Sequence, residues 1–468
     1  MKDLIDMSLN INNLDLKKES KIEFLFEGIK NGEFKTDKDA RAAIFGSENC
    51  TAYYSELKGK LRDALVDAAI MNSNQGSEAN KAFAKASKYY LAALHFYRAG
   101  SRIAGHELSK KACNIARKYN FTQLHFLASN EIAHHYGAIE GDTREFNFFL
   151  KEAHTSFENL QSEVMARLSY LEIAHKHANS RSLKKNLLPI IDEKVKQIQS
   201  IPHANTFSFV IYYYNIQAFK HSILRDFEGM ILLCDEALLK LKAIKAKPYI
   251  GYFAFKVKKL MAFISLSEYG LAQKELDDCL RLAPKGSYNW ALALVYKAIL
   301  GFYSNNLEQT AEAIGHARKL YNKLPENVRD QWLVIEAFLD FLKGRNVKMG
   351  KLLNQVDLFS RDKQGANIPV IILEAISLLK SGKKGGLIDK AEAYKQYAHR
   401  NLRGETTIRS NLFMKMLLQI PAGRFKREVV ERRVKQYQAR LSSHDIEAIE
   451  VEMVPYEALW EKVLELLD

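Results

Sequence analysis

A helical repeat of about forty residues is the strongest constraint that this sequence places on its fold. Before residue 445, nearly every window has apolar residues at helical spacing, as in "KASKYYLAALHFYRAG". This 3.6-residue periodicity predicts an all-helical chain. Because proline ends a helix without disturbing the next one, regularly spaced prolines mark the units. Five of them fall between helical stretches, at intervals of 46, 36, 41 and 44 residues: Pro202, Pro248, Pro284, Pro325 and Pro369.

Two series of small residues recur with the same period. Small side chains let two helices approach closely, so we expect both series to lie where helices cross. The first-helix series is Ala93, Ala133, Ala174, Ala218, Ala262, Ala298, Ala337 and Ala375, and the second-helix series is Ala112, Ala153, Val195, Ala237, Cys279, Ala317, Val356 and Ala398. With polar turns such as "RAGSR" and "YSNNL", they predict eight helical hairpins over residues 77–402.

The segment "FISLSEYGLAQKELDDCLRLAP" carries Ala272, Leu276, Cys279 and Pro284 in the pattern of a tetratricopeptide (TPR) second helix. The chain therefore resembles the TPR family over about 70% of its length. Its period is nearer 40 than the roughly 34 residues of that family, and the first-helix signature is degenerate. Two further stretches, "IFGSENCTAYYSELKGKLRDALVDA" and "VPYEALWEKVLELL", look like segments of uncharacterised bacterial TPR proteins. The resemblance implies a TPR-like α-solenoid with a groove for a protein or peptide.

The sequence on either side of the repeats predicts two further regions. Residues 1–75 form a separate module of three helices, joined to the repeats by the polar linker "SNQGSEAN". Residues 403–468 contain a basic helix and an acidic tail. In the tail, residues 449–453 alternate apolar and charged side chains, which predicts a short strand before a final helix. Pro189 does not fit as a linker, and it either kinks the second helix of the third unit or sets its first turn.

Two Glu-x-x-His motifs one repeat apart raise the question of a metal site. Glu131 with His134, and Glu172 with His175, each place a carboxylate and an imidazole on one helical face, as in di-iron bundles. Equivalent helices of stacked hairpins run parallel, so the two pairs form a ladder and do not converge. We therefore expect packed imidazoles, with groove-lining contacts and metal ligation as the alternatives, and predict no metal site. The candidate partner-binding histidines are His134, His135, His175 and His177.

The C-terminal basic helix concentrates positive charge. Residues 403–441 hold ten basic and three acidic residues, whereas residues 442–468 hold eight acidic residues and one lysine. The candidate partner-binding residues here are Arg424, Lys426, Arg427, Arg432 and Arg433. These side chains could bind nucleic-acid phosphates. Alternatively, the acidic tail folds back and neutralises the helix, the helix contacts a protein, or the charges form a solvated face.

The motifs that the sequence lacks narrow its function. It contains no phosphate loop, dinucleotide fingerprint, nucleophile elbow or zinc spacing. Four widely spaced cysteines are typical of reduced cytosolic proteins, and no signal peptide or membrane span is evident. We expect a cytoplasmic, non-enzymatic scaffold or adaptor that binds a protein or peptide, with no cofactor and no membrane.

Two alternatives stay open. One is a ligand-gated regulator with an N-terminal effector module, which resembles the layout of Rap-type phosphatases and peptide-sensing transcription factors. The other is a nucleic-acid-binding protein that uses the Arg-rich helix.

Overall fold

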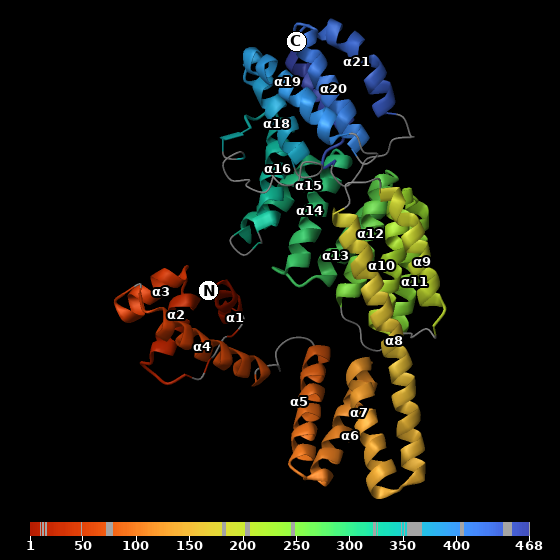
Figure 1. The fold of residues 1–468 in the computed structure, drawn as a ribbon. Helices are drawn as coiled ribbons and strands as arrows, with labels where there is room; N and C mark the ends of the chain where they lie inside the picture. Colours follow the sequence, from red (N-terminus) through yellow and green to blue (C-terminus); the bar gives the residue numbers. More distant parts are fainter. Residues whose placement is uncertain are drawn as a thin grey trace. The chain divides into compact units, whose positions relative to one another are not determined.

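The structure is a computed structural model, and its regular elements are helices throughout the residues it describes (Figure 1). The chain divides into two compact units, Met1–Gln161 and Ser162–Asp468, and each is described by itself. The described residues are 1–9, 11, 14, 16–47, 49–71, 78–179, 184–201, 206–244, 249–321, 324, 326–347, 349–350, 352, 367–402, 407–442 and 452–467. The prediction of an all-α chain is therefore confirmed for these residues.

The first unit begins with four helices that share one small apolar core. They are α1 (Lys2–Leu9), α2 (Lys21–Lys30), α3 (Asp37–Phe45) and α4 (Thr51–Met71). The core holds Leu4, Leu25 and Leu61, none of which is exposed. The sequence predicted only three helices here, because α1 is short and its apolar residues were not recognised as helical. Of the predicted linker, residues 73–77 lie outside the described residues, whereas residues 78–80 already belong to the helix that begins at Glu78.

The remaining elements of the first unit are packed consecutively, α5 against α6 and α6 against α7. They are α5 (Glu78–Arg98), α6 (Arg102–Tyr119), α7 (Thr122–His135), the π-helix η1 (Tyr136–Glu140) and the start of α8 (Thr143–Asn179). The sequence predicted two separate helices where α8 runs without a break. No glycine or proline occurs between Ser156 and Tyr170, so nothing in this stretch ends the helix.

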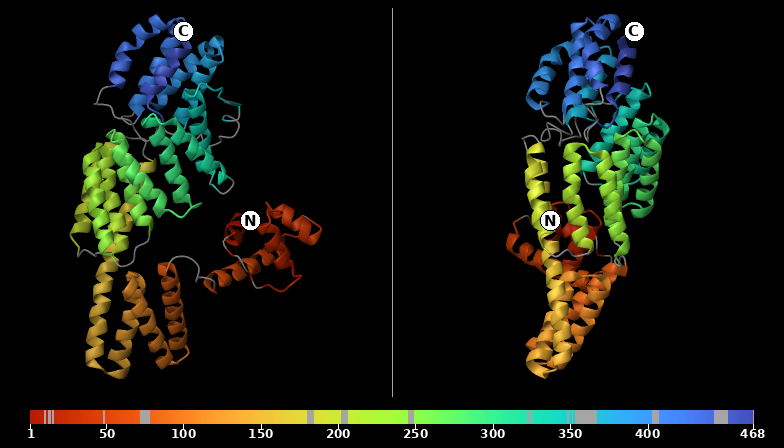
Figure 2. Two further views of the ribbon diagram at one scale, coloured as in Figure 1. Left: turned by 180° about the vertical axis from the view of Figure 1, so that it is seen from behind. Right: turned by 90° about the vertical axis from the view of Figure 1, so that its right-hand side faces the viewer.

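The second unit contains the rest of α8 and a longer series of helices. They are η2 (Lys184–Leu187), α9 (Leu188–Gln199), α10 (Phe207–Leu224), α11 (Phe227–Ala243), α12 (Tyr249–Ser265), α13 (Tyr269–Leu282), α14 (Tyr288–Tyr303), α15 (Leu307–Arg318), α16 (Glu326–Leu342), α18 (Asn367–Lys380), α19 (Lys384–Asn401), α20 (Ile408–Ala422), α21 (Arg427–Leu441), α22 (Tyr456–Leu464) and η6 (Glu465–Leu467). Figures 1 and 2 show α10 to α13, in yellow to green, lying side by side, and each of these helices contacts the next one.

Side-chain caps fix where several of these helices begin. Thr206, Asp226, Ser287 and Asn306 each accept a hydrogen bond from the backbone N–H three residues later. Such caps satisfy a donor that the first helical turn leaves free. Pro189 lies in the first turn of α9, so the second of its two predicted roles is the correct one. Helix starts in this unit therefore follow from short-range sequence signals.

Prolines mark the repeat less cleanly than the sequence suggested. Pro284 lies in the short connection between α13 and α14, as predicted. Pro369 instead belongs to the first turn of α18. Backbone N–H groups in a first turn have no partner within the helix, so a proline there costs no hydrogen bond. The other three prolines of the predicted series, Pro202, Pro248 and Pro325, lie outside the described residues.

The small residues that recur along the sequence are mostly buried. Ala93, Ala218, Ala262 and Ala298 are each at most 1% exposed. The other buried members of the two series are Ala112, Ala133, Ala153, Ala237, Cys279, Ala317, Ala337, Ala375 and Ala398. Ala174 and Val195, in the predicted hairpin whose first helix is the end of α8, are half-buried. Val356 lies outside the described residues. Close packing of neighbouring helices at these positions leaves no room for larger side chains.

The predicted C-terminal strand is wrong for the residues that can be judged. Glu452 and Met453 have no strand pairing, no described residue of the chain is in a strand, and residues 449–451 lie outside the described ranges. Glu452 points into the protein and accepts the backbone N–H of Tyr456, so it supports the start of α22. The predicted final helix is confirmed as α22. Glu452, in the part of this pattern that the structure describes, packs inward at the start of the helix.

Helix pairing continues beyond the predicted end of the repeats. α20 packs against both α19 and α21, and α22 contacts α21. Residues 408–441 therefore form one more pair of adjacent helices where the sequence predicted a single basic helix. One apolar core joins described residues from Ala291 on α14 to Leu464 on α22.

Candidate functional site

A buried pair of histidines lies between the start of α6 and the end of α7. His106 on α6 and His135 on α7 stack with ring centroids 3.9 Å apart and an interplanar angle of 20°. They are only 6% and 8% exposed. The ring of Tyr136 stands edge-on to His106, with centroids 4.9 Å apart. Two imidazoles are thus enclosed between adjacent helices beside an aromatic ring.

Local sequence explains why this cluster can form. A Cβ atom at Gly105 would lie 2.7 Å from Cδ1 of Tyr97, so only glycine lets that ring pack against α6. After His135 the helix widens into a π-turn that ends at Gly141, whose φ of 78° favours glycine. Such π-turns often occur at functional sites. The widened turn directs Glu140 back toward His135, with Oε2 3.2 Å from Nε2.

The histidine pair is only partly satisfied by protein groups. Neither ring nitrogen of His106 has a hydrogen-bond partner among the described residues, and Nδ1 of His135 has none either. Burial lowers the pKa of His106 to about 4, and the neighbouring His135 and Lys110 act in the same direction. His106 is therefore a neutral base at pH 7, since a buried charge without a partner is costly.

A surface pocket lies next to the histidine pair. Its volume is about 300 Å³, and it is formed by the end of α7, the π-turn and the start of α8. The lining residues are Ala133, His134, Tyr136, Gly137, Ala138, Gly141, Asp142, Thr143 and Phe146. A Cβ atom at Gly137 would lie 2.6 Å from the ring of Phe146, so glycine is needed for this shape. The wall is mainly apolar, with one imidazole and one carboxylate.

The two Glu-x-x-His motifs differ in their surroundings. His134 is exposed and lines the pocket, whereas the next residue, His135, is buried. Glu172 is held by two lysines, with Lys176 Nζ at 2.8 Å and Lys194 Nζ at 3.1 Å. Within the described ranges, no group of three or more His, Cys, Asp or Glu side chains is arranged to hold a metal ion.

The other two candidate histidines lie in the second unit. His175 is exposed on α8. His177 is half-buried, with its ring centroid 5.0 Å from that of Phe219. No stacked histidine pair like that of His106 and His135 occurs at these two positions among the described residues.

The candidate basic residues differ in their surroundings. Arg424 and Lys426 are exposed in the turn between α20 and α21. Arg427 pairs with Glu431 on the same helix, Nε to Oε1 at 2.9 Å. Arg432 and Arg433 are exposed, and their Nε atoms donate to Glu428 O and Gln419 Oε1 respectively. No ion pair joins Arg424, Lys426, Arg432 or Arg433 to a described residue of the acidic tail.

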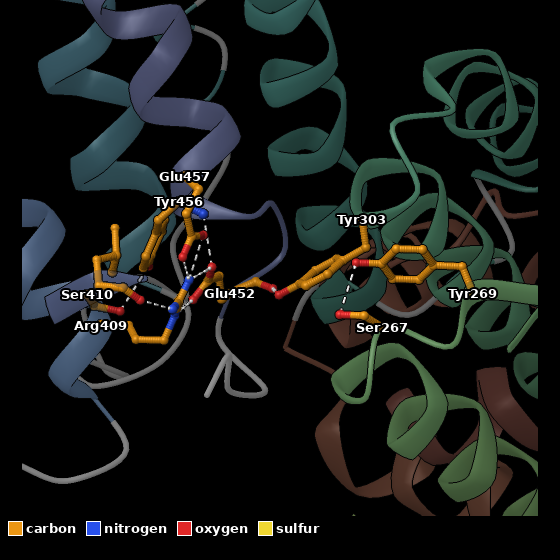
Figure 3. Close-up of polar contacts among 9 residues, drawn as sticks. Ser267, Tyr269, Tyr303, Arg409, Ser410, Glu452, Tyr456 and Glu457 are labelled. Carbon is orange, nitrogen blue, oxygen red and sulfur yellow. Dashed lines mark hydrogen bonds and ion pairs between the residues drawn. The ribbon is translucent and has the colours of Figure 1, made fainter. Parts of the chain in front are cut away.

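The acidic tail binds a different arginine, which the sequence reasoning did not identify as a site. Arg409 on α20 is 7% exposed. Its Nε lies 2.7 Å from Glu452 Oε2, and its Nη2 lies 2.8 Å from Glu457 Oε2 (Figure 3). Arg409 also donates from Nη1 to the carbonyl of Leu441 at 2.6 Å. Although burial opposes the charge, the two carboxylates hold the pKa of Arg409 above its ordinary value.

Aromatic and hydroxyl groups also hold the acidic tail against α14 and α20. Tyr303 on α14 donates to the carbonyl of Glu452 at 3.0 Å, and the hydroxyls of Ser410 and Tyr456 lie 2.9 Å apart (Figure 3). The ring of Phe413 stacks on that of Tyr456, with centroids 4.7 Å apart. Arg409 and Phe413 are four residues apart in an apolar helix, so they share one face of it. This spacing was the sign in the sequence that Arg409 points inward.

A search for membrane-spanning helices and three comparisons with known proteins complete the description of the chain. Among the described helices, none combines the length and the low charge that crossing a membrane requires. Comparison with protein-family models, curated proteins and solved structures gives no match.

Proposed function

We propose that this protein is a cytoplasmic, non-enzymatic scaffold or adaptor, built as a TPR-like α-solenoid, that binds a protein partner. The observation that carries the proposal is the pocket of about 300 Å³ beside His134. Its size is at the lower end of the range for ligand pockets. A single bulky apolar side chain of a peptide or helix fits this volume better than an extended cofactor does.

The chemistry of the wall supports a peptide anchor. Ala133, Ala138 and Phe146 provide apolar contact, and His134 and Asp142 provide polar groups at the same wall. Protein interfaces commonly place one large apolar or aromatic side chain in a pocket with polar groups around it. The nearby π-turn sets the shape of the wall, because Gly137 brings Phe146 close to the backbone.

A peptide selection tests the proposal directly. Short random peptides are displayed and selected on the full-length protein, and we expect enrichment of sequences with one bulky apolar residue. Ala138→Phe fills the pocket from its own wall and should weaken the selected peptides at least about tenfold, or ~1.4 kcal/mol. Ala99→Phe, at an exposed position in the turn between α5 and α6, is the matched control and should leave binding unchanged.

Two results would count against the proposal. One is a selection that enriches no apolar-anchored peptide. The other is a set of selected peptides that bind Ala138→Phe as tightly as the wild type, because those peptides would not use the pocket.

A further inference from the structure

Three consecutive turns of the second unit are rich in lysine and arginine. They follow α16 (residues 343–346), join α18 to α19 (381–383), and join α20 to α21 (423–426). The second and third turns each connect the two described helices of a hairpin, α18 to α19 and α20 to α21. Because stacked hairpins place equivalent turns at the same end, turns some forty residues apart become neighbours.

Side-chain contacts place these turns next to one another. Lys380, at the end of α18, donates from Nζ to the carbonyl of Arg345 in the preceding turn. Lys384, at the start of α19, holds its Nζ 5.2 Å from the ring centroid of Phe425 in the following turn. The three turns therefore form one continuous surface. We call it the basic ridge, and its residues are Arg345, Lys380, Lys383, Lys384, Arg424 and Lys426.

Most of the positive charge on the basic ridge is available to a partner. Lys383, Lys384, Arg424 and Lys426 are exposed, and no described carboxylate forms an ion pair with them. Arg345 has Asp340 at 3.7 Å. In the acidic tail, Glu452 and Glu457 are bound to Arg409. The described part of the tail therefore does not neutralise the ridge.

We propose that the basic ridge binds the phosphate backbone of a nucleic-acid duplex without reading its sequence. Closely spaced phosphates attract clustered Lys and Arg and release condensed counterions on binding. The whole chain has a formal net charge of +14, which favours association with such a polyanion. This interaction is separate from the pocket beside His134, which lies in the other compact unit.

A duplex fits this surface better than a single strand does. Proteins that bind single strands place exposed aromatic rings under successive bases. Phe425, whose ring lies next to the ridge, is half-buried and has Lys384 Nζ beside it. It is therefore not open for a base to stack on. The remaining ridge side chains are cationic and suit phosphates.

Binding of a fluorescent duplex of roughly 20 base pairs to the full-length protein, followed by anisotropy, tests this proposal. The ridge variant combines Lys383→Glu, Lys384→Glu, Arg424→Glu and Lys426→Glu. The control combines Lys240→Glu, Lys242→Glu, Lys274→Glu and Lys285→Glu, which changes the net charge equally at four exposed lysines. Circular dichroism verifies that both variants remain helical.

We expect the ridge variant to lose at least about tenfold in affinity at 0.1 M salt, and the control to lose less than about threefold. The dependence of log K on log salt should become shallower by roughly four in the ridge variant. Equal losses in the two variants, or no duplex binding at about 50 mM salt, would overturn the proposal. Tighter binding of a single strand, of polyglutamate or of anionic vesicles would also overturn it, in favour of that partner.

Discussion

Arg409 and Glu452 form a buried bidentate ion pair, in which Nε lies 2.7 Å from Oε2 and Nη2 lies 2.9 Å from Oε1. The two residues are 43 positions apart in the sequence. Both are less than one tenth exposed. The pair joins α20 to the segment that precedes α22, so the position of the C-terminal helix depends on it.

Removal of one partner of this pair should be strongly destabilising. Arg409→Ala leaves the Glu452 carboxylate buried without its cation, so we expect a loss of about 3–5 kcal/mol in the free energy of unfolding. Urea denaturation followed by tryptophan fluorescence measures it. Arg427→Ala, which breaks an exposed pair with Glu431, should cost less than ~1 kcal/mol. Similar losses in both variants would contradict the role given to burial. The double variant Arg409→Met/Glu452→Leu should recover much of the stability, because it removes both charges together.

Replacement of two glycines of one hairpin by alanine should change the stability of the protein in opposite directions. A Cβ atom at Gly301 would lie 2.9 Å from the carbonyl oxygen of Asn306, and Thr310 beside it is held by a 2.9 Å hydrogen bond to Ala298 O. Gly301→Ala should therefore cost about 1–3 kcal/mol. A Cβ atom at Gly315, on α15, meets nothing within 4 Å. Gly315→Ala should stabilise the protein by up to ~1 kcal/mol. Melting temperatures of the two variants check the sign, and a shift of both in the same direction would refute it.

Mild acid should destabilise the histidine pair. In the unfolded chain His106 takes up a proton near pH 6.5, whereas in the folded protein burial lowers its pKa to about 4. The unfolded state therefore binds more protons between these values, and folding stability falls as the pH is lowered through this window. The shift corresponds to about 3 kcal/mol at most. The free energy of folding that neutral His106 contributes is fully present above pH 6.5 and is lost as the pH falls toward 4.

His106→Leu should flatten this part of the stability profile, measured by urea denaturation from pH 7 to pH 4. His154→Leu, at an exposed position on α8, is the matched control and should keep the wild-type slope. An unchanged slope in His106→Leu would show that other groups cause the acid sensitivity.

The four cysteines should divide by accessibility to thiol reagents. Cys113, Cys234 and Cys279 are fully buried, and burial raises the pKa of the first to about 11 and of the other two to about 12. Cys50 is only partly buried. A disulfide reagent at pH 8 should label Cys50 rapidly and the rest only on unfolding. Mass spectrometry identifies the modified residue, and Cys50→Ser should abolish the fast phase. Rapid labelling of any other cysteine in the native protein would contradict this burial pattern.

Local features were predictable from the sequence because they depend on nearby residues. Helical periodicity and the turns around Gly100 and Asn305 gave the positions of most hairpins, and small residues such as Ala298 marked buried crossing points. The merger of two helices into α8 was missed. Its boundary was inferred from the repeat period, whereas the residues themselves contain no helix-ending signal.

Contacts between distant residues could not be read from the sequence. Nothing local indicates that His106 stacks on His135, or that Arg409 meets Glu452 across 43 positions. The alternating residues before Pro455 have the pattern of a strand, and the inward direction of Glu452 shows why the described ones, Glu452 and Met453, pair with no strand. The prediction of partner-binding residues likewise favoured the dense positive charge on and beside α21. The buried arginine that holds the acidic tail, Arg409, is instead on α20.

The attachment of α22 also orders the steps by which this end of the protein can fold. Phe413 and Arg409 lie on α20, but the groups that cover them, Tyr456 and Glu452, come more than forty residues later. A nascent or truncated chain that stops before Glu452 presents an aromatic ring and an uncompensated cation to solvent. Exposed apolar surface of this kind is what chaperones and proteases act on. Docking of α22 therefore conceals a signal that a chain stopping before Glu452 displays.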